Sequence, residues 1–87
     1  MSDDMRIRRQ RRSELLKAIY KASDASVTEF VSAHDLTEQL EIDAEESRKI
    51  IAYLEEKGYL LVDDHRAGVV RITAEGIDAV ELGRLDG

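Results

Sequence analysis

The stretch from Asp43 to Leu60, DAEESRKIIAYLEEKGYL, decides the fold because it joins a capped amphipathic helix to the start of a strand. Asp43 is a good N-cap, and Glu46 can return the hydrogen bond in a capping box. The apolar residues recur at helical spacing and form one inward stripe: Ile50, Ile51 and Leu54, with the small Ser47 a turn earlier. Gly58 can end the helix because glycine adopts the C-terminal cap conformation without steric cost. The sequence predicts a helix over 44–57.

Two more helices are predicted before this stretch. The first is indicated by four residues that recur at helical spacing: Leu15, Leu16, Ile19 and Tyr20. A turn-rich segment over 23–26 follows it. After an extended segment over 27–31, Ser32 can cap a helix from about Ala33 to Glu41. A tight turn at Ile42 then leads into the helix over 44–57.

A hairpin and a last helix are predicted after it. The segments Tyr59–Val62 and Val69–Ile72 have the composition of strands, and residues 63–68 form the loop between them. Thr73 can cap a final helix whose apolar candidates are Ile77, Val80, Leu82 and Leu85. The predicted order is α-β-α-α-β-β-α, a mainly α fold with a small β-hairpin (α+β). Two helices joined by a short turn and followed by a hairpin form a winged helix-turn-helix.

Length and composition fit one small domain. The chain has 87 residues, of which 43% are hydrophobic and 37% charged, and it contains no Cys. It therefore has room for one core, and disulfides and thiolate metal sites are excluded. We expect a basic N-terminal arm or helix extension over 1–12 and a winged helix-turn-helix domain over 13–87.

The sequence gives no sign of a membrane segment. No apolar run approaches the roughly 18 residues of a membrane span, and the N-terminus leads into arginines rather than into an apolar secretion signal. We therefore expect a cytoplasmic protein without a membrane partner.

Charge is distributed unevenly along the chain. Residues 1–21 hold seven bases and three acids, a charge of +4, whereas residues 22–87 hold six bases and sixteen acids, a charge of −10. A polyanion should therefore meet the N-terminal segment first.

Five arginines make that segment basic: Arg6, Arg8, Arg9, Arg11 and Arg12. Their guanidinium groups can neutralise several phosphates or reach into a minor groove, as basic arms do. The alternatives are a solvated start to the first helix, or a docking strip for the acidic body of a second copy.

Three segments resemble winged helix-turn-helix regulators of the MarR and PadR kind: Val31–Leu36, Tyr53–Leu60 and Ile72–Ile77. The resemblance covers roughly residues 13–82 and implies a transcriptional regulator that binds double-stranded DNA, with a homodimer through its terminal helices. By position, it implies that the DNA-facing residues of the helix over 44–57 are Glu45, Glu46, Arg48, Lys49, Ala52 and Tyr53, with Arg66 at the wing tip. Asp63 and Asp64 lie beside Arg66 in the sequence and are expected to blunt its field.

A second hypothesis is a winged helix that binds a basic protein instead of DNA. The helix over 44–57 has four acids against three bases, and the helix before it has Asp35, Glu38 and Glu41 with no base. Such carboxylates oppose phosphate contact unless they accept from cytosine amino groups. Arg48 and Lys49 can also form surface pairs with acids a turn away.

Catalysis and cofactor binding have no support in the sequence. There is no phosphate-binding glycine loop and no nucleophile motif. His34 has no second histidine nearby that would favour a metal site, and His65 is expected to be an exposed loop residue. We therefore expect neither enzyme activity, nor a metal, nor a cofactor.

Overall fold

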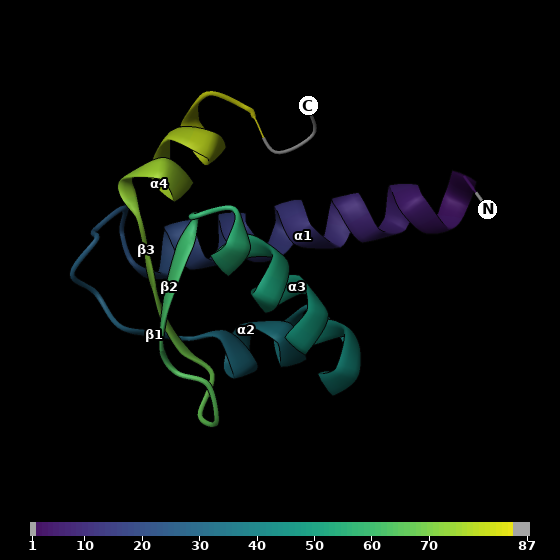
Figure 1. Ribbon diagram of the computed structural model, residues 1–87, viewed down its shortest axis with the longest axis horizontal. Coiled ribbons are helices and arrows are strands. Elements are labelled where there is room, and N and C mark those ends of the chain that lie inside the picture. The colour runs from purple at the N-terminus through teal and green to yellow at the C-terminus, as the bar shows by residue number, and fades with distance from the viewer. Residues whose placement is uncertain (1, 85–87) are drawn as a thin grey trace.

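The structure is a computed structural model that describes residues 2–84, with side chains from Asp4 onward. Its elements follow the predicted order (Figure 1): α1 Ser2–Ala22, β1 Val31–Ser32, α2 Ala33–Gln39, α3 Ala44–Glu56, β2 Leu60–Asp64, β3 Val69–Ile72 and α4 Ala74–Glu81. The described part of the chain is thus an α+β fold with four helices and one antiparallel sheet of three strands. Leu85, a candidate for the last helix, lies outside the described residues.

The three predicted N-caps are confirmed. The side chains of Ser32, Asp43 and Thr73 each accept a hydrogen bond from the backbone N–H three residues later. The donor–acceptor distance is 2.9 Å for Asp43 and 3.0 Å for Thr73. The prediction that the side chain of Glu46 returns the hydrogen bond in a capping box is wrong, because the carboxylate of Glu46 accepts from Arg11 of α1 instead.

The sheet has the strand order β1-β3-β2. The predicted hairpin is confirmed, but β2 begins at Leu60 and continues to Asp64, past a bulge between Val62 and Asp64. Of the segment expected to be extended over 27–31, only Val31 belongs to a strand, and residues 27 and 28 form a turn. There the Ser26 hydroxyl lies 3.0 Å from that of Thr28, and this local hydrogen bonding competes with strand pairing.

α2 ends earlier than predicted, at Gln39. Glu41 has a left-handed backbone with φ of 59°, and the Ile42 N–H donates to the Thr37 carbonyl at 2.9 Å. These features stop the helix as a C-terminal capping motif does. α3 ends at Glu56, one residue before the predicted end, and Gly58 follows its C-cap Lys57 with φ of 79°.

The core lies where α1 meets the other elements. Its largest fully buried side chains come from α1, α3, β2 and β3: Leu15, Leu16, Ile19, Leu54, Leu60, Val70 and Ile72. Ile77 and Val80 of α4 pack against this cluster, whereas Leu82 is 62% exposed.

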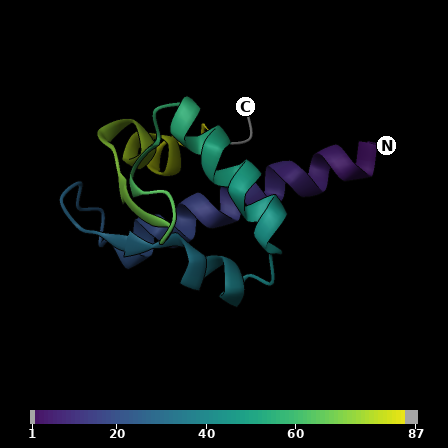
Figure 2. The ribbon, with the colours of Figure 1, turned by 60° about the horizontal axis from the view of Figure 1, so that its bottom comes forward.

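The basic N-terminal segment forms the first half of α1 and so extends that helix. Figures 1 and 2 show this half running beyond the rest of the molecule, on the side away from the β2–β3 loop. Within residues 2–84, no helix combines the length and apolar character needed to cross a membrane.

Candidate functional site

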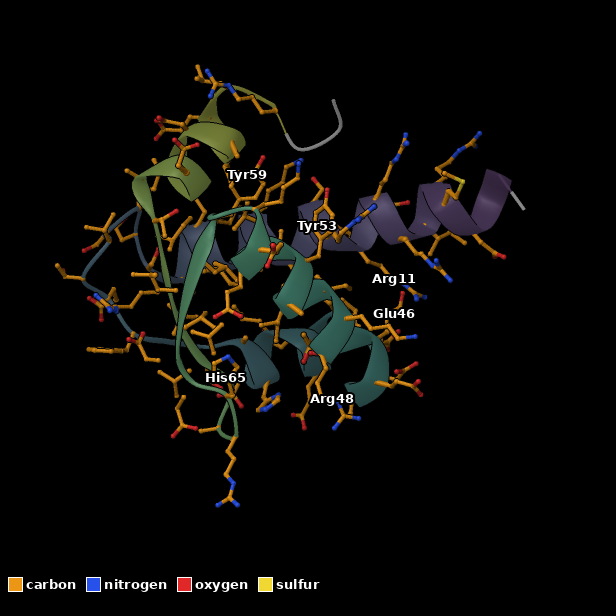
Figure 3. All side chains as sticks on the ribbon, in the orientation of Figure 1. Arg11, Glu46, Arg48, Tyr53, Tyr59 and His65 are labelled. Atoms are coloured by element: carbon orange, nitrogen blue, oxygen red, sulfur yellow. The ribbon has the colours of Figure 1, made fainter. Side chains whose placement is uncertain are left out.

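Two adjacent arginines of α1 contact two residues of α3. The Arg11 guanidinium donates to the Glu46 carboxylate, and the Arg12 guanidinium lies 4.1 Å from the centre of the Tyr53 ring. Figure 3 shows Arg11 and Glu46 directed toward each other where α1 passes α3. The hydrogen bond to Glu46, together with the charge of that carboxylate, raises the pKa of Arg11 above its ordinary value. We call these four residues the α1–α3 junction.

A groove of about 480 Å³ lies along this junction. Its lining residues come from both helices: Arg8, Arg12, Asp43, Glu45, Glu46, Lys49, Ile50 and Tyr53. Glu46 is neutralised by Arg11. Lys49 and Glu45 lie 3.9 Å apart, with side chains 75% and 77% exposed, so water screens that pair strongly. The groove therefore holds three bases, Arg8, Arg12 and Lys49, beside the carboxylates of Asp43 and Glu45, which Arg11 does not compensate.

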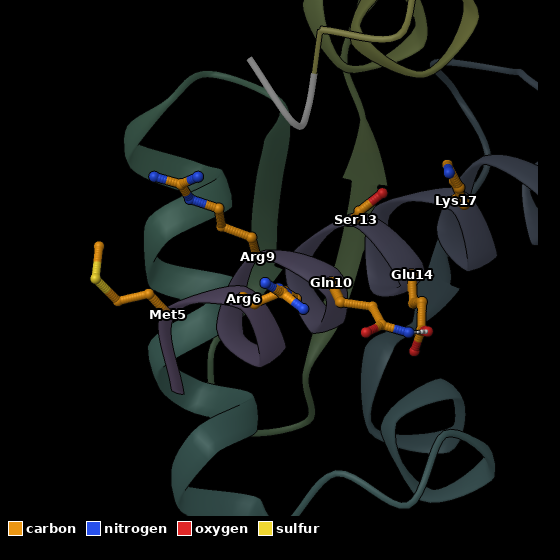
Figure 4. Close-up of a pocket in the computed structure, with 7 residues that line it drawn as sticks. All are labelled: Met5, Arg6, Arg9, Gln10, Ser13, Glu14 and Lys17. Atoms are coloured by element: carbon orange, nitrogen blue, oxygen red, sulfur yellow. Dashed lines mark hydrogen bonds between the residues drawn. The ribbon is translucent and has the colours of Figure 1, made fainter. Parts of the chain in front are cut away.

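The five arginines do not form one strip. Arg11 and Arg12 belong to the junction, and Arg8 lines the groove. Arg6 and Arg9 instead border a second hollow, of about 670 Å³, whose described lining residues all belong to α1 (Figure 4). Successive residues of an α-helix are rotated by about 100°, so a contiguous run is spread around the helix axis. The five guanidinium groups therefore start from different sides of α1.

The rest of α3 presents Arg48 and Ala52 to solvent. Figure 3 shows Arg48 at the same end of the molecule as the β2–β3 loop, residues 65–68. His65 in that loop has Nε2 3.6 Å from Oε2 of Glu55, so loop and helix approach each other. Arg66 is exposed in the loop. α3 and the loop thus form the two sides of one exposed surface.

The aspartates beside Arg66 have other partners. Asp64 Oδ1 accepts from the backbone N–H groups of Arg66 and Ala67, at 2.9 and 3.0 Å. Asp63 forms a bidentate pair with Arg71, with Nη2 and Oδ1 2.9 Å apart. This hydrogen bond to Asp63 raises the pKa of Arg71. The expectation that both carboxylates blunt the field of Arg66 is wrong for Asp63, whose charge is compensated.

Sequence reasoning did not find the Asp63–Arg71 pair, and it did not find the partner of Phe30. The Arg71 guanidinium lies 5.4 Å from the centre of the Phe30 ring, which is 63% exposed. The available signal was that successive side chains of a strand point to opposite faces of the sheet. The register pairs Leu61 with Arg71, and Asp63 lies two residues after Leu61 in β2. These residues define the outer face of the sheet.

The described residues include no group of three or more His, Asp or Glu side chains that could hold a metal ion. None of the protein-family models, curated proteins or solved structures compared with the chain matches it.

Proposed function

We propose that this chain is a winged helix that binds double-stranded DNA as a transcriptional regulator. In this proposal α2 and α3 are the helix-turn-helix, α3 enters the major groove and the β2–β3 loop is the wing. The first half of α1 lies along the phosphate backbone. The element order and the exposure of Arg48 and Arg66 on one surface support this assignment.

The observation that carries the proposal is the α1–α3 junction. Phosphate contacts supply much of the affinity for a duplex, so a carboxylate at the start of a recognition helix normally opposes binding. Arg11 compensates the carboxylate of Glu46, whose side chain is 23% exposed. The same contact fixes α1 beside α3, which brings Arg8 and Arg12 to the groove that also holds Lys49.

The proposal assigns different roles to the candidate residues. Arg48 and Ala52 face the bases, with Glu45 as an acceptor for a cytosine amino group. The residues that contact phosphate are Arg8, Arg12, Lys49 and Arg66. Arg11, Glu46 and Tyr53 act inside the protein by holding the two helices together.

The test is fluorescence anisotropy with a short random-sequence duplex over a series of salt concentrations. Arg8→Gln and Lys49→Gln should each weaken binding and reduce the slope of log affinity against log salt by about 1, since each removes one phosphate contact. Lys21→Gln is the matched control: it also removes one exposed positive charge, but in the last turn of α1. It should leave both quantities unchanged.

Two results would contradict the proposal. One is the absence of any complex at low salt. The other is an equal loss of affinity in the Lys21→Gln control, because uniform sensitivity to charge would mean that the groove is not the contact surface.

The second candidate function is binding of a basic protein. The observation that favours it is the outer surface of α2, where Asp35 and Glu38 are exposed and no base occurs in the helix. Sedimentation of the chain with and without duplex DNA separates the two functions. A chain that does not bind DNA but forms a stoichiometric complex with a basic protein has the second function. The same measurement determines whether the chain forms the expected homodimer.

A further inference from the structure

His34 connects the start of α2 to the β2–β3 loop. Its ring is half-buried, and its Nε2 lies 3.3 Å from the carbonyl oxygen of Arg66. A carbonyl oxygen only accepts hydrogen bonds, so Nε2 of His34 carries the hydrogen. The contact therefore requires a ring that donates from Nε2.

Gly68 provides the space that the His34 ring occupies. A Cβ atom on Gly68 would lie 2.5 Å from Cδ2 of His34, which is closer than carbon atoms approach in proteins. Gly68 also has φ of 70°, a conformation that other residues rarely adopt. The backbone N–H of Ala33 donates to the Gly68 carbonyl at 2.8 Å. The end of the loop is thus fixed to α2.

The start of the loop is fixed by a different residue. Asp64 Oδ1 binds the N–H groups of Arg66 and Ala67, while His34 binds the carbonyl of Arg66. The backbone of Arg66 is therefore held through both its N–H and its C=O. Its side chain alone is left to solvent.

We propose that His34 is a positioning residue that fixes the wing tip, and with it Arg66, relative to α3. In this arrangement the wing is formed before DNA arrives, so no ordering of the loop has to accompany binding. The structural part of the inference concerns the free protein, whereas its effect on affinity rests on the proposed function.

NMR of the free 87-residue chain tests the structural part. The ¹⁵N shifts of the His34 ring should show the hydrogen on Nε2, and the amides of residues 65–67 should be ordered. His34→Ala should mobilise these amides, whereas His34→Gln, which keeps a side-chain N–H donor, should restore part of their order. His65→Ala is the matched control and should leave the loop ordered, since His65 contacts Glu55 instead.

Binding of the random-sequence duplex tests the functional part. Loss of one hydrogen bond predicts that His34→Ala weakens binding about three- to tenfold. In an Arg66→Gln background the same substitution should change affinity less than about twofold, because His34 acts through Arg66. His34→Phe keeps a ring beside Gly68 without the donor and should resemble His34→Ala.

The outcomes separate the two proposals. A hydrogen on Nδ1 with none on Nε2, or loop amides as mobile in the wild type as in His34→Ala, overturns the positioning role whether or not DNA binds. Equal losses from His34→Ala in both backgrounds also overturn it. An ordered loop in a chain that binds no duplex leaves His34 as the wing anchor and contradicts the DNA proposal instead.

Discussion

Ser47 shows how one buried hydroxyl bears on stability. Its Oγ is inaccessible to solvent and has no hydrogen-bond partner among the described residues. A buried polar group without a partner costs free energy, and the small side chain occupies a position on the inward stripe of α3. The position therefore uses the small volume of serine but not its polarity.

We expect Ser47→Ala to raise the free energy of unfolding by about 1 kcal/mol, because it removes the unpaired hydroxyl and improves helix propensity. Urea denaturation measures this. Ser23→Ala is the matched control: Ser23 is also 1% exposed, but its hydroxyl donates to the Tyr20 carbonyl at 3.1 Å. That variant should lose stability. A loss in both variants would show that Ser47 has a partner in solution.

Glu41 ends α2 in the left-handed region, with φ of 59°. A side chain there costs roughly 1–2 kcal/mol, which glycine avoids at some cost in chain entropy. We expect Glu41→Gly to raise the free energy of unfolding by about 0.5 kcal/mol. Glu38→Gly makes the same chemical change inside the helix and should lower it by about 1 kcal/mol. Thermal denaturation of both variants compares the signs, and equal signs would contradict the assigned helix end.

Helix α4 is tied to α1 by a hydrogen bond that depends on pH. The Tyr20 hydroxyl donates to Glu81 at 2.7 Å, and this bond, together with burial, raises the pKa of the phenol above its ordinary value. The folded state thus favours the protonated phenol. The contribution to stability is complete below the ordinary phenol pKa of about 10 and is lost as pH rises through the folded value.

Tyr20→Phe removes this titration. We expect the stability advantage of the native chain over this variant to be constant below about pH 9 and to shrink in more alkaline solution. Urea denaturation at a series of pH values measures it. Tyr53→Phe is the control, since Tyr53 lies on α3 against Arg12. The Tyr53→Phe variant keeps Tyr20 and should therefore still lose stability in alkaline solution. A constant advantage of the native chain across the whole range would contradict the role of Tyr20.

At the scale of elements, the starts of α2, α3 and α4 and the glycine after α3 were predictable because their signals are local. Ser32, Asp43 and Thr73 act on backbone groups three residues away, and Gly58 acts on its own turn. β1 was predicted less well. A strand needs a partner, and the local hydrogen bonds of Ser26 decided the conformation of the residues before Val31.

Side-chain partners were less predictable at the scale of the whole molecule. Glu46 has acceptable partners within one helical turn, yet it binds Arg11, which is 35 residues away in the chain. Arg71 and Asp63 are brought together by strand register, and His34 and Arg66 by the closing of the hairpin onto α2. Each pair forms because tertiary packing brings its two residues together. The spacing of the residues in the sequence therefore did not predict these partners.

Because α1 is unbroken, its N-terminal half extends from one side of the molecule, and the two sides of the molecule differ. Residues 4–10 rise about 10 Å along a rigid rod, which corresponds to about three base pairs of a duplex. This overhang lies on one flank of α3 and the wing on the other (Figure 2). In the proposed complex the two flanks of the duplex therefore meet different chemistry. A single chain then binds in one preferred direction where the site is asymmetric, whereas over a symmetric site the two directions are equal in energy.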